Sequence, residues 1–305
     1  MATVSVIIPT CNRAAYLRTA LDSVLSQTFT DFEVIVVDDA STDDTSRVVK
    51  EFKAVSIQYV RHDENRGGSV ARNTGIAKSQ SEYIAFLDDD DEWEPTKLEL
   101  QMDLLKRSAP NVGLVYTGCR AIDRATGKVL GQRTPAQRGD LSTDMLRENC
   151  IGSTSSTVLK RVCFEEVGVF DHTLPSFQDY DLWIRLAAKF HIECVSLPLL
   201  KYYTHEHKIW TNPQAIMKGI ALMLEKHKTF PSELPKYFSH HMLAVGEMYC
   251  RKGDFKQGRL AYREAIRLYP YALRYYLDFA LSLVGHGTWT KVKELKQKFT
   301  GSVGH

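Results

Sequence analysis

Cysteine and long apolar runs are both scarce in this 305-residue chain. Its six cysteines stand far apart with no Cys-x-x-Cys pair, so the sequence supports neither a disulfide scaffold nor a zinc site, and we expect reduced thiols. No apolar run approaches the roughly 20 residues that a membrane-spanning helix needs. The first apolar run, residues 4–8, is too short for the core of a secretory signal and has no basic flank. These absences predict a cytoplasmic protein.

The chain also has little net charge of either sign. The chain has 39 Lys and Arg against 37 Asp and Glu, a formal net charge of +2, so we expect no nucleic-acid partner. Lys291, Lys293, Lys296 and Lys298 form a basic run near the C-terminus. A solvated helix face is the simpler interpretation of these lysines, and a peripheral contact with the inner face of an anionic membrane is the alternative.

Strand and helix patterns alternate over the first part of the chain. Continuous apolar runs predict strands, and apolar residues at helical spacing predict the helices between them. Alternation of this kind predicts an α/β fold with a mostly parallel sheet and helices on both of its faces. The predicted strands are residues 4–8, 32–37, 56–60, 83–87, 113–117 and 154–159.

From Pro213 onward only helical patterns remain. We therefore predict two domains, a sheet domain over residues 1–212 and an all-α extension over residues 213–305. Residues 243–270 resemble one tetratricopeptide-like helical hairpin, with Gly253 at its turn. No clear second copy follows, and one repeat cannot bury its own faces, so we expect an appendage and not a solenoid.

Four consecutive aspartates, residues 88–91, follow the strand predicted at 83–87. Carboxylates packed this closely repel one another and cost free energy where they are desolvated. In open α/β sheets, ligands bind outside the carboxyl ends of the strands, and Mg²⁺ usually binds carboxylates together with substrate phosphates. The aspartates therefore predict a divalent cation that bridges to a diphosphate. The alternative is a solvated acidic turn whose last aspartate caps the helix near Pro95.

Five motifs together resemble family 2 glycosyltransferases, which are inverting, nucleotide-sugar-dependent enzymes of the GT-A fold. The resemblance covers about the first two-thirds of the chain, and the motifs occur in the expected order. The matching motifs are Val4-Ser5-Val6-Ile7-Ile8-Pro9-Thr10-x-Asn12-Arg13, Val37-Asp38-Asp39-x-Ser41-x-Asp43, Ala71-Arg72-Asn73-x-Gly75-Ile76, Phe86-Leu87-Asp88-Asp89-Asp90-Asp91-x-Trp93 and Asp179-Tyr180-Asp181-Leu182-Trp183-x-Arg185.

The resemblance implies a role for individual residues. Asp179 would be the general base, with Asp181 in reserve. Asp90 would bind the metal, Mn²⁺ or Mg²⁺, and His205 would be a further metal or phosphate contact. Asp39 would accept a hydrogen bond from uracil. The full set of implied nucleotide-binding residues is Pro9, Thr10, Asn12, Arg13, Asp39, Arg72, Asp88 and Asp89.

Several of these residues have structural alternatives. Arg72 can simply pair with the acidic residues, and Asp38 is expected to hold the turn before Ser41. Asp179 stands where a helix cap belongs, and a helix N-terminus lowers the pKa of a carboxylate and weakens it as a base. Tyr203 stands where relatives often have Arg, so cationic help for the leaving group is either weaker or comes from elsewhere.

The resemblance implies a metal-dependent enzyme that moves a sugar from a UDP-sugar to a hydroxyl group of a glycan, lipid-linked or protein acceptor. One carboxylate without an enzyme nucleophile predicts a single displacement with inversion. The polar residues 124–140, expected to be a mobile loop, would help to select the acceptor. The alternatives are a non-catalytic nucleotide-binding scaffold and a sugar nucleotidyltransferase. The latter usually has a basic, glycine-rich loop that Pro9-Thr10-Cys11-Asn12 does not resemble.

Overall fold

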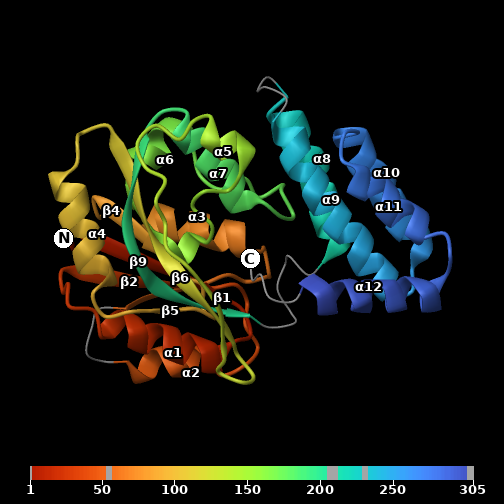
Figure 1. The fold of residues 1–305 in the computed structure, drawn as a ribbon. Coiled ribbons are helices and arrows are strands. Elements are labelled where there is room, and N and C mark those ends of the chain that lie inside the picture. Colours follow the sequence, from red (N-terminus) through yellow and green to blue (C-terminus); the bar gives the residue numbers. More distant parts are fainter. Residues whose placement is uncertain (1, 53–56, 205–211, 229–232, 301–305) are drawn as a thin grey trace. The chain divides into compact units, whose positions relative to one another are not determined.

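The computed structural model describes residues 2–52, 57–204, 212–228 and 233–300, with side chains up to residue 293. The described chain forms two compact units. The first contains a β-sheet and its covering helices (Figure 1). The second consists of the C-terminal helices together with the short segments Leu146–Glu148 and Thr173–Phe177. The boundary predicted at residue 212 stays a prediction.

The first unit contains one nine-stranded sheet within its described residues. Its order is β3-β2-β1-β4-β8-β6-β9-β5, and β7 pairs with the outer part of β6. The strands are β1 (Val4–Thr10), β2 (Phe32–Asp38), β3 (Ile57–Arg61), β4 (Tyr83–Phe86), β5 (Glu92–Trp93), β6 (Val112–Asp123), β7 (Val129–Arg133), β8 (Thr157–Lys160) and β9 (His191–Thr204).

The predicted α/β class is confirmed, but the sheet is mixed. The strands β3, β2, β1 and β4 are parallel neighbours, as strand–helix alternation predicts. Beyond β4 the sheet changes, because β8 is antiparallel to both β4 and β6. The expected parallel arrangement is therefore confirmed for the first four strands and recurs between β6 and β9, while the other strand pairs of the sheet are antiparallel. Strand direction there depends on long-range pairing, which local hydrophobic patterns do not encode.

Helices cover both faces of the parallel strands. α1 and α2 lie on one side and α3 on the other (Figure 1). Val6 and Ile8 of β1 join Leu21 of α1 in one buried core, whereas Ile7 faces α3, where a Cβ on Gly75 would lie 2.3 Å from its Cγ2. The helices described before residue 204 are α1 (Ala14–Leu25), α2 (Thr45–Glu51), α3 (Gly68–Lys78), α4 (Lys97–Arg107), α5 (Asp144–Arg147), α6 (Val162–Val167) and α7 (Gln178–Ala187).

Three strands escaped the sequence analysis, the two-residue β5 together with β7 and β9. β9 contains Pro198, which weakens a strand pattern, and the pairing of β6 with β9 shifts register beside it. β7 lies inside residues 124–140, so the expectation of a loop throughout that segment is wrong. Val129 and Leu130 of β7 are more than half exposed. A polar, exposed hairpin lacks the buried apolar run that predicts a strand.

The second unit is entirely helical at the C-terminus, as predicted. Asn212 caps α8 by accepting hydrogen bonds from the N–H groups of Gln214 and Ala215 at 3.1 and 3.2 Å. No helix among the described residues combines the length and the apolar run needed to cross a bilayer. The helices are α8 (Pro213–Lys226), α9 (Glu233–Arg251), α10 (Phe255–Leu268), α11 (Leu273–Leu281) and α12 (His286–Thr300).

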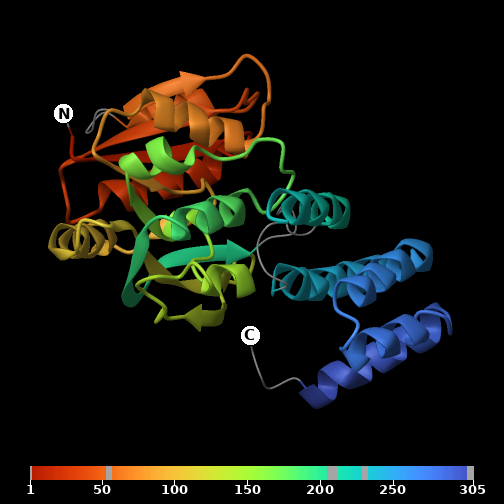
Figure 2. The ribbon, with the colours of Figure 1, turned by 90° about the horizontal axis from the view of Figure 1, so that it is seen from above.

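α9 and α10 form a hairpin and lie side by side in both views (Figures 1 and 2). Gly253 makes the turn with a φ of 84°, and Asp254 caps α10 by accepting a hydrogen bond from the N–H of Gln257 at 3.0 Å. Gly246 lets the helices approach closely, because a Cβ there would lie 2.4 Å from the ring of Tyr262. The likeness of this hairpin to a tetratricopeptide repeat stays a prediction.

Candidate nucleotide and metal site

The carboxyl ends of β1, β2 and β4 meet at one edge of the sheet, because the three strands are parallel neighbours. The N–H of Asp39 donates to the carbonyl of Thr10 at 2.8 Å, and the Thr10 hydroxyl donates to Asp89 Oδ2 at 2.7 Å. Pro9, one residue before Thr10, is buried in β1. The motifs at the ends of β1, β2 and β4 therefore adjoin.

Three carboxylates gather in the turn after β4. Asp88, Asp90 and Asp91 each offer an oxygen, and these oxygens lie within 4.8 Å of one another. The N–H of Asp91 donates to the carbonyl of Asp88 at 3.0 Å and closes the turn. An all-oxygen, carboxylate-rich donor set suits a hard divalent cation such as Mg²⁺ or Mn²⁺. Asp91 was not among the predicted ligands, and only its place in the turn brings it into the set.

Two guanidinium groups partly compensate the acidic turn. Arg13 Nη1 lies 3.1 Å from Asp89 Oδ1 and 3.3 Å from Asp90 Oδ2. Arg72, on α3, forms an ion pair with Asp88. The expected cationic compensation therefore includes these two side chains, and the alternative considered for Arg72, pairing with the acidic residues, is what the structure contains.

Asp89 connects β1 to the acidic turn. It is only 4% exposed and contacts both Thr10 and Arg13. Burial raises the pKa of Asp89 to about 6, with Arg13 opposing and Asp90 adding to the shift. Asp89 does not belong to the set of three converging carboxylates among the described residues. Its contacts suit a positioning role better than direct metal binding.

Asp179 lies in the first turn of α7, close enough to the acidic turn to be coupled to it electrostatically. Burial raises its pKa, an effect that the N–H of Tyr180 and the charge of Arg72 oppose and that Asp88 reinforces. The expectation that the helix N-terminus leaves Asp179 with a lowered pKa is therefore wrong, because desolvation exceeds it. Asp88, Arg72 and Asp179 thus share one environment.

Asp181 is held elsewhere. Its side chain is fully buried, and its Oδ2 accepts from Arg185 Nη2 at 2.7 Å and from Nε at 3.0 Å. Arg185 also donates to the carbonyl oxygen of Val169 at 2.9 Å. A carboxylate enclosed in this way anchors α7 to the preceding loop and is a poor candidate for the base.

Asp39 shapes the loop that follows β3. It accepts hydrogen bonds from the N–H groups of Arg66 and Gly67 at 2.9 and 2.7 Å, and His62 Nδ1 lies 2.7 Å from its Oδ1. A carboxylate has about four acceptor positions, so Oδ2, with one of these donors, can accept another. Asp39 can thus combine loop positioning with contact to a ligand.

The loops after β1 and β2 are tied together. Asn12 has a φ of 54°, its N–H donates to Ser41 Oγ at 2.9 Å, and its Oδ1 accepts from the N–H of Thr42 at 2.7 Å. The N–H of Ser41 in turn donates to Asp38 Oδ1 at 2.8 Å. The structural role expected for Asp38 is confirmed. These bonds make Asn12 part of the wall of the site.

Arg124 is a component that the sequence analysis missed. Its guanidinium carbon lies 4.4 Å from the ring centre of Tyr16 and 3.9 Å from that of Tyr203. The same guanidinium donates to the backbone carbonyl of Asp90. The family resemblance led us to expect an arginine at position 203, and the ring of Tyr203 instead contacts the guanidinium of Arg124. The departure at Tyr203 was the only signal, and the partner could not be read from local sequence.

Ser155 supports the acidic turn through a hydrogen bond. Its hydroxyl accepts from the N–H of Asp88 at 3.0 Å, and its carbonyl accepts from Trp93 Nε1 at 2.7 Å. Ser155 is fully buried. It belongs to a 3₁₀ turn over Thr154–Ser156, where the sequence had predicted the start of a strand. His205, the other predicted metal contact, lies outside the described residues.

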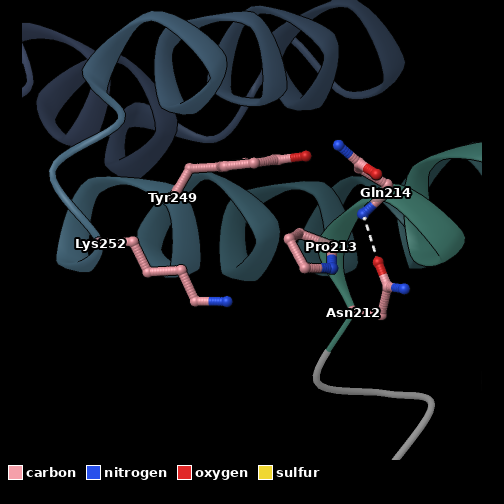
Figure 3. Close-up of a pocket in the computed structure, with 5 residues that line it drawn as sticks. All are labelled: Asn212, Pro213, Gln214, Tyr249 and Lys252. Carbon is pink, nitrogen blue, oxygen red and sulfur yellow. Dashed lines mark hydrogen bonds between the residues drawn. The ribbon is translucent and has the colours of Figure 1, made fainter.

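A separate pocket belongs wholly to the second unit (Figure 3). It has a volume of about 360 Å³ and is lined by Asn212, Pro213, Gln214, Tyr249 and Lys252. The side-chain oxygen of Asn212 is already used in capping α8. None of these five lining residues is a carboxylate, so the pocket lacks the charged oxygen donors that the acidic turn offers a divalent cation.

Comparisons with known proteins point in one direction. A model of the family described as Glycosyl transferase family 2 matches residues 5–161. An uncharacterized glycosyltransferase of Rickettsia bellii is 35% identical over 216 residues, which cover 67% of this chain and 30% of that protein. This chain spans between 30% and 61% of the length of five such rickettsial relatives.

Two other matches carry more specific names. An Escherichia coli protein named UDP-Glc:alpha-D-GlcNAc-diphosphoundecaprenol beta-1,3-glucosyltransferase is 28% identical over 211 residues, 68% of this chain and 80% of that protein. The crystal structure of S. aureus TarS 1–349 in complex with UDP-GlcNAc has a TM-score of 0.66 at 17% identity, and the match covers 97% of this chain and 92% of that one. The second likeness is one of fold.

Proposed function

The chain belongs to glycosyltransferase family 2 and has the GT-A fold, and from this premise we propose that it transfers a sugar from a UDP-sugar to an acceptor hydroxyl with inversion. The observation that carries the proposal is the shared environment of Asp88, Arg72 and Asp179 at the carboxyl edge of the parallel strands. That one cluster supports both diphosphate binding and proton removal.

The diphosphate end of the donor would lie at the acidic turn. Asp88, Asp90 and Asp91 would hold a divalent metal ion, which when bound supplies Lewis-acid stabilisation of the departing diphosphate. Arg13 and Arg72 already carry positive charge beside these carboxylates. These two guanidinium groups would neutralise the phosphate oxygens of the donor once the donor competes with the carboxylates for them.

The nucleoside would lie against the loops after β1 and β2. Asp39 Oδ2 would accept from the N–H of uracil, the role that the position of its carboxylate allows. Pro9, Thr10 and Asn12 would form the wall of this pocket, because hydrogen bonds join their loop to the one that follows Asp39. A base with an N–H at that edge is favoured over one without it.

Asp179 would remove the proton of the acceptor hydroxyl as that oxygen attacks the anomeric carbon. Its raised pKa makes it a better base than an exposed aspartate. A single displacement needs one base and no enzyme nucleophile, so the product would have inverted configuration. The positive charge of Arg72 lowers the pKa of Asp179, whereas the negative charge of Asp88 raises it. Arg72 would therefore help to keep the base ionised beside other carboxylates.

We favour a lipid-linked acceptor among the three classes that the sequence allows. The relative from E. coli is named for a sugar acceptor on diphosphoundecaprenol, and the TarS structure contains a UDP-sugar. These names suggest that a UDP-hexose and a lipid diphosphate-linked glycan are the first substrates to test.

The replacement Asp179→Asn tests the assignment of the base. Binding of UDP, measured by isothermal titration with Mn²⁺ present, should stay within a few-fold of the parent. Sugar transfer, or hydrolysis of the UDP-sugar if the acceptor is unknown, should fall at least about 100-fold, the lower range for a general base. Asp103→Asn, on the exposed side of α4, is the matched control and should leave both quantities unchanged. Undiminished turnover in Asp179→Asn would assign the base to another residue.

A further inference from the structure

An apolar strip lies on the outer side of α11. Leu273, Tyr276 and Leu277 are 71%, 43% and 58% exposed, and Ala280 continues the strip one turn later. Their spacing of three, four and seven residues places them on one helix face. The opposite face buries Tyr275 and the charged Asp278. This helix therefore exposes its apolar face and buries polar groups.

The turn after α11 extends the strip. Leu283 and Val284 are 61% and 56% exposed. Tyr271, just before the helix, is 84% exposed. Scattered apolar residues on a surface need no explanation, but a contiguous run of this kind marks a site of interaction. We use the name α11 strip for the exposed apolar residues of this segment, which are Tyr271, Leu273, Tyr276, Leu277, Ala280, Leu283 and Val284.

A basic stripe of α10 borders the α11 strip. Lys256, Arg263 and Arg267 are exposed on the outer side of α10 at spacings of seven and four residues, with the 45% exposed Leu260 between them. The guanidinium carbon of Arg263 lies 5.4 Å from the ring centre of Phe279 in α11. The basic stripe of α10 and the α11 strip are thus adjacent.

The distribution of charge along the whole chain matches this local pattern. Residues 213–305 contain 15 Lys and Arg against 7 Asp and Glu, whereas residues 1–212 contain 24 against 30. All of the chain's positive excess therefore lies in the C-terminal helices. Such asymmetry between the parts of a chain indicates an anionic partner for the basic part.

We propose that the α11 strip inserts into the surface of an anionic lipid bilayer, with the basic stripe of α10 contacting the headgroups. An apolar helix face beside a basic one is typical of helices that lie in the membrane interface, and Tyr271 and Tyr276 suit that depth. A second copy of the chain fits less well, because a two-fold interface through the strip would bring like basic stripes together. A nucleic acid would leave the apolar residues without a contact. The surface is independent of the transfer chemistry.

Co-sedimentation of the full chain with lipid vesicles tests this proposal. We expect binding to vesicles of equimolar phosphatidylcholine and phosphatidylglycerol, weaker binding to pure phosphatidylcholine, and a loss of this difference at high salt. Leu273→Glu and Leu277→Glu should each lower the partition coefficient at least about tenfold, equivalent to ~1.4 kcal/mol. Arg263→Gln with Arg267→Gln should reduce only the preference for the anionic vesicles.

Leu197→Glu is the matched control, since Leu197 of β9 is also about half exposed and should not affect vesicle binding. Binding of UDP should be unchanged in all variants, so failure here and failure of the transfer proposal are distinguishable. No binding to the anionic vesicles, or equal binding by Leu277→Glu, would overturn the proposal. So would a dimer detected by light scattering that Leu277→Glu dissociates, because the strip would then bind a second copy.

Discussion

At the scale of single residues, burial and ion pairs decide what each aspartate can do. The chain has carboxylates at residues 88–91, and each has a different environment. Asp88 pairs with Arg72, Asp89 is buried against Thr10, and Asp90 and Asp91 complete the converging set. Consecutive residues of one kind thus acquire different roles, because the turn directs Asp89 to Thr10 and brings oxygens of the other three together.

The raised pKa of Asp179 has a consequence for the pH dependence of transfer. The base must be ionised to accept a proton, so kcat/KM should fall as pH decreases through the pKa of Asp179. Because burial raises that pKa, the acidic limb should lie above the value of about 3.9 for an ordinary aspartate. Rates measured across acidic and neutral pH with saturating Mn²⁺ check this. An acidic limb at or below the ordinary value would contradict a desolvated base.

Arg124 is expected to act by positioning the acidic turn. Arg124→Ala removes the donor to the Asp90 carbonyl and the group stacked between Tyr16 and Tyr203. We expect Mn²⁺-dependent UDP binding to weaken about 10- to 100-fold, as for other groups that orient metal ligands. Titration of EDTA-treated protein with Mn²⁺ at fixed UDP measures the effect.

Arg120→Ala is the matched control for Arg124, because Arg120 lies near the end of β6, four residues before Arg124, and pairs with Glu94 at 2.7 Å. It should leave Mn²⁺-dependent binding unchanged. Arg124→Lys should recover part of the affinity, since Lys keeps the charge but not the planar group. Equal losses of affinity in the Arg120 and Arg124 variants would indicate a general structural effect.

At the scale of elements, the contact of α3 with β1 sets the position of Arg72. Arg72 and Gly75 lie one turn apart on α3, and Gly75 sits directly over Ile7. A larger residue at 75 would push the helix from the sheet and move the guanidinium away from Asp88. The glycine in the motif Ala71-Arg72-Asn73-x-Gly75-Ile76 is thus explained by packing.

Gly75→Ala should therefore destabilise the protein. A Cβ at 2.3 Å from Ile7 Cγ2 overpacks the core, which typically costs about 1–3 kcal/mol and outweighs the helix propensity gained, about 1 kcal/mol. Urea unfolding measures the change. Gly287→Ala, in α12 with open space around the new Cβ, is the helical control and should be neutral or slightly stabilising. Equal stability of the two variants would show that α3 can shift without cost.

At the scale of the whole molecule, charge is divided between two parts of the chain. The sheet part has an acidic excess although its proposed donor is an anion, so donor binding needs local positive charge from Arg13, Arg72 and a divalent cation. The helical part has the basic excess and the exposed α11 strip. If vesicle binding follows that strip, the chain would meet a lipid-linked acceptor at a membrane surface through its helical part.

Much of this protein was determined by sequence alone. Apolar runs and their alternation with helices predicted the α/β class and the four parallel strands, because strands buried on both faces are continuous apolar segments. The motifs that end these strands predicted the edge at which Thr10, Asp39 and Asp88 lie. Parallel topology brings such strand ends together whatever the details of packing.

Tertiary structure alone decided the rest. The antiparallel pairing of β8, the partners of Asp39 and the placement of Arg124 between Tyr16 and Tyr203 all join residues distant in sequence. The entry of Asp91 into the carboxylate set depends instead on the folded geometry of the turn after β4. Desolvation likewise reversed the expected pKa shift of Asp179. Hydrophobic periodicity is a local property and could therefore be read from the sequence. Burial and long-range contacts depend on the whole folded chain, so only the tertiary structure could decide them.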